Sequence, residues 1–125
     1  MFALSFIKKA LDMTQFGLSD KTLETVRDIL STCPEIEKAL VYGSRAKGNY
    51  RTGSDIDITL VGAQLNMDML FKLVRLFDES NLPYMVDLSI MANISNPNLL
   101  DHIERVGQVL YQRDNSSADL QKQIT

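Results

Sequence analysis

Residues 55–61, in which acidic and aliphatic side chains alternate, constrain the fold more than any other part of the sequence. Ile56 and Ile58 fall on one side of an extended chain and Asp55 and Asp57 on the other, because strand side chains alternate between two faces. Successive side chains on one face of a strand are about 6.6 Å apart. The pattern therefore predicts a strand with its isoleucines in a core and its two aspartates on the opposite face.

A second predicted strand, residues 84–90, repeats this arrangement, with Asp87 opposite Val86 and Leu88. If the two strands are neighbours, three carboxylates converge. Two such charges about 4 Å apart repel by roughly 4 kcal/mol at an effective dielectric near 20, so either some protonate or a cation compensates them. Mg²⁺ prefers oxygen ligands and shares itself with phosphates, and pairs of such ions are common in phosphoryl-transfer sites. The acids Asp55, Asp57 and Asp87 are therefore predicted metal ligands for two Mg²⁺ ions, with Asp57 bridging them.

The loop before the first acidic strand has a composition suited to phosphate. Gly43 lets backbone approach a ligand closely, and Ser44 adds a hydroxyl. If a helical turn starts there, its free N–H groups favour an anion. Arg45 and Lys47 add positive charge nearby. Ser54 has two open roles, as a cap at the strand or as a phosphate contact, and it completes the set of predicted nucleotide-binding residues.

The remaining pattern alternates between helices and strands. Helices are expected at residues 20–32, 67–80 and 96–107, and strands at residues 36–42, 55–61, 84–90 and 109–111. This order predicts an α/β or α+β fold, a small mixed sheet covered by helices. The helix at 67–80 is apolar on more than one face, which leaves surface for a partner.

The sequence also predicts the limits of the domain. Residues 1–17 form an N-terminal extension, for which a short amphipathic helix and a loosely attached segment both stay open. Residues 18–111 form the domain, and residues 112–125 form a polar, flexible tail. Two starts, Met1 and Met13, stay open for the chain.

Composition narrows the class of protein. The chain has 125 residues, enough for one domain, with 45% hydrophobic and 23% charged residues. Its net charge of −3 lacks the basic footprint of a protein that binds long nucleic acid strongly. The single cysteine allows no internal disulfide, and no apolar run approaches the roughly 20 residues of a membrane span. A cytoplasmic protein without a membrane partner is expected.

Four other residues are given structural roles. Cys33 is expected to be a buried thiol, because no thiolate-stabilising neighbour is near it in sequence. His102, the one histidine, is expected at the surface or boundary rather than as a general base. Tyr42 and Tyr50 are expected to pack rather than to stack on a base.

The glycine-serine pair, the paired aspartates that follow after ten intervening residues and the third strand acid together carry a family resemblance. The stretches GSRAKGNYRTGSDIDITL and PYMVDLSI resemble the DNA polymerase β-like nucleotidyltransferase superfamily, in particular its MNT-type branch of minimal nucleotidyltransferases. The likeness covers residues 18–111. It implies that Gly43 and Ser44 hold a nucleoside triphosphate, with ATP expected, and that Asp55 and Asp57 hold the metals. Asp87 would ligate the catalytic metal and help to activate the acceptor hydroxyl.

The acceptor is open at this point. MNT-type proteins resemble one half of a pair, whose other half is a separate α-helical HEPN-type or substrate-binding protein, and some are antitoxins that add AMP to that partner. Three hypotheses follow from the resemblance: transfer of a nucleoside monophosphate to a partner hydroxyl, transfer to a small molecule such as an antibiotic, and a binding module that neutralises a helical partner by contact.

Overall fold

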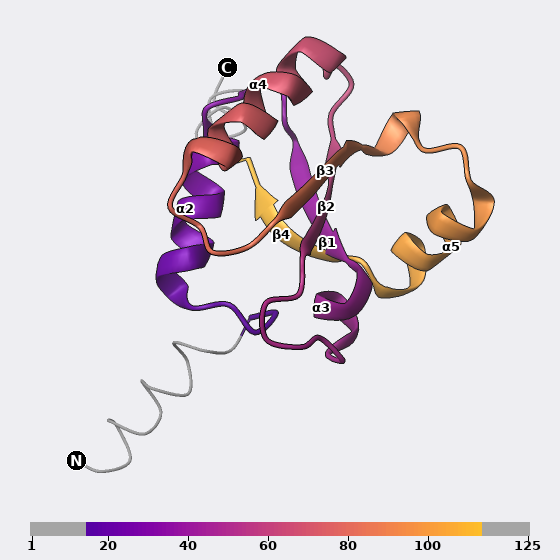
Figure 1. Ribbon diagram of the computed structural model, residues 1–125. Coiled ribbons are helices and arrows are strands. Elements are labelled where there is room, and N and C mark those ends of the chain that lie inside the picture. Colours follow the sequence, from indigo (N-terminus) through magenta and orange to yellow (C-terminus); the bar gives the residue numbers. More distant parts are fainter. Residues whose placement is uncertain (1–14, 114–125) are drawn as a thin grey trace, which may run out of the picture.

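The computed structural model describes residues 15–113 (Figure 1). The elements follow in the order α2 (Asp20–Ser31), β1 (Lys38–Tyr42), α3 (Gly43–Lys47), β2 (Ile56–Val61), α4 (Met67–Glu79), β3 (Val86–Ile90), the 3₁₀ turn η1 (Met91–Asn93), α5 (Pro97–Val106) and β4 (Gln108–Gln112). Most of the predicted N-terminal extension and tail lie outside the described residues. Among the helices of residues 15–113, none is long and apolar enough to span a membrane.

The four strands form one mixed sheet in the order β3-β2-β1-β4. β1 pairs antiparallel with both β2 and β4, whereas β2 and β3 run parallel. The parallel pair needs a crossover, and α4 supplies it, as the alternation of elements predicts. The expected small mixed sheet with helices is confirmed, and the two acid-bearing strands are neighbours, the condition on which convergence of the carboxylates depended.

Local sequence signals set the starts of the three longer helices. The side chains of Ser19 and Asn66 accept hydrogen bonds from backbone N–H groups of the first turns of α2 and α4. Asn96 caps α5 in the same way, with Pro97 at the first helical position. Gly107 ends α5 as predicted, and a Cβ at this position would lie 2.4 Å from the Ile103 carbonyl oxygen, so the position favours glycine.

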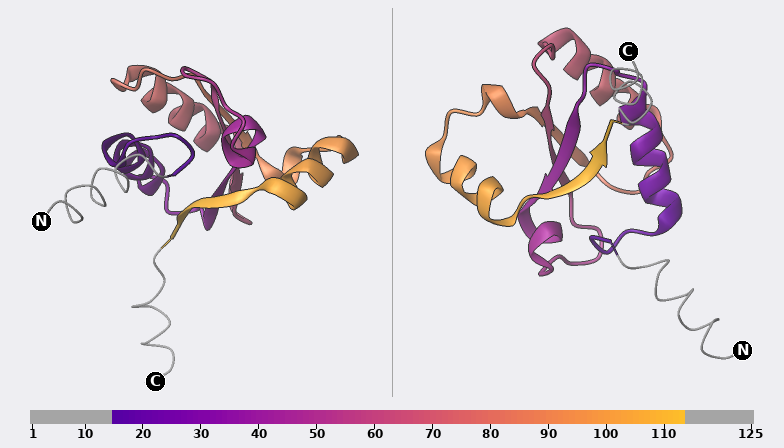
Figure 2. Two further views of the ribbon diagram at one scale, coloured as in Figure 1. Left: turned by 90° about the horizontal axis from the view of Figure 1, so that it is seen from below. Right: turned by 180° about the vertical axis from the view of Figure 1, so that it is seen from behind.

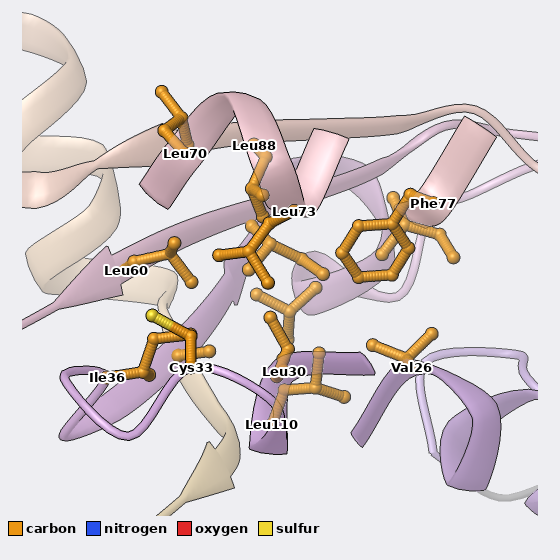
Figure 3. Packing of buried hydrophobic residues seen from close by; sticks show 14 of the residues in the cluster. Val26, Leu30, Cys33, Ile36, Leu60, Leu70, Leu73, Phe77, Leu88 and Leu110 are labelled. Atoms are coloured by element: carbon orange, nitrogen blue, oxygen red, sulfur yellow. The ribbon is translucent and has the colours of Figure 1, made fainter. Parts of the chain in front are cut away.

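The core lies between one face of the sheet and the helices α2 and α4 (Figure 3). β2 contributes Ile56, Ile58 and Leu60, which are all fully buried. The helices contribute the apolar stripes that their spacing predicts, Leu23, Val26 and Leu30 from α2 and Leu70, Leu73 and Phe77 from α4. Cys33 is buried beside them, as expected, and burial raises the pKa of its thiol. On α4, Met67, Phe71 and Leu76 stay exposed, so the helix has the extra apolar surface that its sequence indicates.

The remaining helices, α3 and α5, pack against each other and against β1. In Figures 1 and 2, α5 lies on the opposite side of the molecule from α2. The segment before β2, expected as a loop in which a helical turn could start, begins with the short helix α3 at residues 43–47. Gly48, in the left-handed conformation with φ of 87°, ends this helix by donating its N–H to the Ser44 carbonyl oxygen.

Candidate active site

The two acid-bearing strands bring the carboxylates to one end of the sheet. Asp57 in β2 is the register partner of Asp87 in β3. Asp55 directly precedes β2, where the Ile56 N–H donates to the Met85 carbonyl oxygen at 2.9 Å and so begins the parallel ladder. The alternation that buries Ile56 and Ile58 directs Asp57 to the face away from the core. The three acids that the sequence selects therefore lie on adjacent chain segments.

Asp57 is the electrostatic centre of this group. It is partly buried, whereas Asp55 and Asp87 are exposed. Burial raises the pKa of Asp57 above its usual range, and the negative charges of Asp87 and Asp55 raise it further. A carboxylate in this environment gains from a cation that neutralises the repulsion.

The donor chemistry of the three acids fits Mg²⁺, because carboxylate oxygens are the ligands that this ion prefers. Within residues 15–113, however, no three acidic, histidine or cysteine side chains are already gathered closely enough to hold a metal ion. The side chains of Asp55 and Asp87 are exposed to solvent.

Gly43 stands directly beside Asp57, because Tyr42, the last residue of β1, pairs with Asp57 across the sheet. Gly43 has a φ of 74°, and a Cβ at this position would lie 2.4 Å from Asp57 Oδ2. Sequence reasoning assigned this glycine to close approach of phosphate. The structure shows an additional cause, since any larger residue would displace the Asp57 carboxylate.

Arg45 is held inside the protein. Its side chain is only 3% exposed, and its guanidinium donates to the carbonyl oxygens of Ser54 and Phe16 over 2.8–3.0 Å. The rings of Tyr50 and Tyr84 lie 5.2 and 4.8 Å from the guanidinium carbon. These contacts tie α3 to the segment that leads into Asp55, so Arg45 supports the loop from within. A packing role for Tyr50 agrees with its expected one.

The other predicted nucleotide-binding residues surround this loop. Lys47 is exposed at the end of α3, and Ser44 is partly exposed in its first turn. The Ser54 hydroxyl accepts the Arg51 N–H at 2.8 Å, which closes a turn just before Asp55. This contact belongs to the turn that leads into β2, and the phosphate contact expected of Ser54 stays a prediction.

Sequence reasoning missed a chain of hydroxyl groups on the acidic face. The Ser89 hydroxyl donates to Thr59 Oγ1 at 3.0 Å, and both residues follow an aspartate by two positions in their strands. Burial raises the pKa of Tyr42, a hydrogen bond with Ser89 lowers it, and the charges of Asp87 and Asp57 raise it. The period-two pattern of the strands places these residues on the acidic face, but hydroxyl residues at such positions are common and drew no functional prediction.

His102 was also missed. The expected boundary position is confirmed, since the residue is partly buried. Its Nε2 accepts the Gly43 N–H at 3.0 Å, and its ring lies edge-on to Tyr42 with centroids 6.2 Å apart. The two partners are 59 residues apart in the chain. No spacing signal in the sequence connects them.

Comparison with solved structures finds similar folds. A chain of a toxin–antitoxin crystal structure with AMP-PNP matches with a TM-score of 0.60 and 23% identity, over 75% of this chain and 76% of that one. A chain of the toxin–antitoxin MntA–HepT matches with a TM-score of 0.51 and 19% identity, over 82% and 79%. A third match, with a TM-score of 0.50, 19% identity and coverage of 80% and 76%, comes from a tri-AMPylated Shewanella oneidensis HEPN toxin in complex with MNT antitoxin. At these identities the likeness concerns the fold.

Sequence comparison identifies the family more directly. No curated protein is similar enough to the chain to match. The family model described as polymerase beta, nucleotidyltransferase matches residues 24–116, a range that contains Gly43, Ser44 and all three acids of the site. This match covers most of the sequence and most of the elements described above. The chain therefore belongs to the polymerase beta nucleotidyltransferase family and is a nucleotidyltransferase.

Proposed function

We propose that the chain transfers a nucleoside monophosphate, AMP from ATP, to a hydroxyl group of a separate α-helical partner protein of the HEPN type, as the antitoxin of a toxin–antitoxin pair. The observation that carries the transfer chemistry is the placement of Asp57 and Asp87 on parallel neighbouring strands beside the Gly43–Ser44 turn. The choice of AMP and of the partner is supported by similar folds, found with AMP-PNP and with an AMPylated HEPN toxin.

In this proposal, Asp55, Asp57 and Asp87 hold two Mg²⁺ ions. The ions would offset the carboxylate repulsion, lower the barrier to attack on the α-phosphorus and stabilise the pyrophosphate that leaves. Ser44 and Lys47 would bind the triphosphate through a hydroxyl and an ammonium group. Gly43 leaves the space that Asp57 occupies, and Arg45 and Ser54 hold the loop that leads to Asp55.

The transfer step is a single displacement. The acceptor hydroxyl oxygen forms a bond to the α-phosphorus while the bond to the pyrophosphate oxygen breaks. Asp87, which is exposed at the sheet edge beside Asp57, is the group proposed to accept the hydroxyl proton. Positioning of the two substrates and charge stabilisation would supply most of the rate acceleration.

A transfer assay tests this function. The protein and the small helical protein encoded next to it, where one exists, are incubated with Mg²⁺ and each α-labelled nucleoside triphosphate, and both chains are then weighed by intact mass spectrometry. We expect the partner to gain the mass of AMP. The double variant Asp55→Asn/Asp57→Asn should lose at least about 100-fold in rate, where each factor of ten corresponds to about 1.4 kcal/mol. Asp78→Asn, which removes an exposed acid of α4 on the core side of the sheet, is the matched control and should transfer normally.

The alternatives give different results in the same assay. If a small molecule such as an antibiotic becomes labelled with no partner present, the acceptor is a small molecule rather than a protein. A stable complex that neutralises the partner equally well with the Asp55→Asn/Asp57→Asn variant would favour the contact module. The exposed apolar side chains of α4, Met67, Phe71 and Leu76, are the observation that keeps this second candidate in view.

A further inference from the structure

We infer that His102 is a positioning residue for nucleotidyl transfer. Its imidazole, carried by α5, holds the Gly43 N–H and so fixes the turn that leads from Gly43, beside Asp57, into Ser44. The kinetic part of this inference rests on the proposed function, whereas the contact itself does not. His102 lies outside the stretch of acids and glycines by which the sequence indicates the site.

Gly43 is constrained from two sides. Its Cα side faces Asp57, with no room for a Cβ, and its N–H points to His102 Nε2 at 3.0 Å. Its φ of 74° is allowed for glycine, but glycine has the widest backbone freedom and can adopt other conformations equally well. A hydrogen bond on the N–H is therefore the contact that selects one geometry for the junction of β1 and α3. Ser44, the next residue, takes its orientation from that junction.

The hydrogen bond also fixes the chemical state of the imidazole. A ring nitrogen that accepts an N–H carries no proton, so the proton of the neutral ring is on Nδ1. The Nε2 lone pair is used by Gly43 and is not available to take a proton from an acceptor hydroxyl. For the same reason the Gly43 N–H is not available to a phosphate oxygen, and the groups of Ser44 take up that role.

Helix α5 has other contacts that hold it in place. Ile103, the residue after His102, is 2% exposed, and the Gln108 side chain after the helix donates to the Ala46 carbonyl oxygen at 3.1 Å. Because Ile103 provides the buried anchor, the hydrogen-bonding group at His102 can be removed without removing the packing of the helix. This separation makes the inference testable by substitution.

The structural test uses the fact that the sequence contains one histidine, so an untagged ¹⁵N-labelled protein gives a single set of ring nitrogen signals. We expect the neutral ring of His102 to carry its proton on Nδ1, with a bare Nε2. The Gly43 amide should exchange faster with solvent in His102→Leu than in the wild type, and His102→Gln, whose side-chain oxygen can accept the same N–H, should restore protection. A proton on Nε2 in the wild type, or unchanged Gly43 exchange in His102→Leu, would overturn the inference.

The kinetic test compares the same variants after their folding is verified by circular dichroism and thermal unfolding. In His102→Leu, KM for the triphosphate should rise roughly two- to tenfold, the range expected for one hydrogen bond, with a smaller change in kcat. His102→Gln should recover most of the wild-type KM, and Glu104→Gln, an exposed neighbour on α5, should not change it. An equal rise of KM in His102→Leu and His102→Gln would show that His102 acts through packing and not through its hydrogen bond. If the wild type transfers to no acceptor, the proposed function fails, and the ring-nitrogen and exchange data alone decide the His102 contact.

Discussion

At the scale of single residues, two positions in the glycine-serine loop have clear roles inside the protein: one leaves space for a side chain, and the other holds backbone carbonyl groups. Gly43 leaves space for the Asp57 carboxylate, and Arg45 bonds the carbonyl oxygens of Ser54 and Phe16. Both residue types were selected from the sequence for phosphate binding. Substitutions at these positions can therefore test whether each residue contributes to stability, to nucleotide binding or to both.

Replacing Gly43 by alanine should cost both stability and activity. The new Cβ would meet Asp57 Oδ2 at a φ that alanine rarely adopts, and such strain costs about 1–3 kcal/mol. Gly48→Ala is the matched control, because its φ of 87° is similarly unfavourable but no atom lies within 4 Å of the added Cβ. Urea unfolding should show a loss for both variants, and the transfer assay a further loss for Gly43→Ala only. Equal activities in the two variants would contradict the proposed link between Gly43 and Asp57.

Substitutions of Arg45 and Lys47 should differ in their effects on the stability of the protein and on triphosphate binding. Arg45→Met leaves the carbonyl oxygens of Ser54 and Phe16 without their charged donor, and we expect a loss of about 3 kcal/mol in the free energy of unfolding. Lys47→Met, at an exposed position, should change stability by less than about 0.5 kcal/mol. It should instead weaken triphosphate binding, measured by calorimetry. If Arg45→Met is as stable as the wild type but binds the triphosphate more weakly, Arg45 contacts the nucleotide, as the sequence predicts.

At the scale of elements, the parallel pairing of β2 with β3 places like charges side by side. Asp57 and Asp87 are register partners, and no residue of the opposite charge is paired with either of them within the described range. Such a pairing reduces stability in the absence of a cation, since the fold favours the protonated form of Asp57. The carboxylate repulsion in the sheet should therefore be visible as a pH dependence.

Without metal, in EDTA, the free energy of unfolding should fall as pH rises through the raised pKa of Asp57. The sign follows from linkage: burial and the charges of Asp87 and Asp55 raise the folded pKa above the unfolded one, so the folded state binds more protons between the two values. Below the unfolded pKa no loss is expected, and above the folded pKa the loss is complete. Asp57→Asn should remove this decline, measured by urea unfolding from pH 3 to pH 8, and Asp78→Asn should keep it. The same slope in wild type and Asp57→Asn would show that another group controls it.

At the scale of the whole molecule, the sheet separates a core face from an acidic face. Helices α2 and α4 cover the first, and α3 and α5 lie beside the second (Figure 2). A ligand on the acidic face that binds only the folded chain must stabilise the entire domain, because ligand binding and unfolding are linked.

Mg²⁺ with ATP should raise the melting temperature, whereas either alone should have a smaller effect. The gain is about 2.7 kcal/mol at a ligand concentration 100 times Kd, and about 1 kcal/mol moves the midpoint of a domain of this size by roughly 4–8 °C. The Asp55→Asn/Asp57→Asn variant should lose this gain while Asp78→Asn keeps it, as measured by scanning calorimetry. An equal rise in wild type and double variant would place the binding elsewhere.

The sequence by itself determined those features whose causes are local. Alternation over residues 55–61 sets the two faces of β2, because side-chain direction in a strand has period two. Ser19, Asn66 and Asn96 set the starts of helices through contacts within their own first turns. Asp55, Asp57 and the glycine-serine pair were found for the same reason, since they belong to one short segment of chain, and Asp87 was found from the alternation within its own strand.

Tertiary structure alone decided which segments meet. The parallel pairing of β2 with β3 brings Asp87 to Asp57 from 30 positions away, and the packing of α5 brings His102 to Gly43 from 59. The interior position of Arg45 depends on Phe16, Ser54 and two tyrosines that its own segment does not predict. Contacts of this kind depend on how layers pack. Packing is a sum over many distant side chains, so no local pattern in the sequence encodes it.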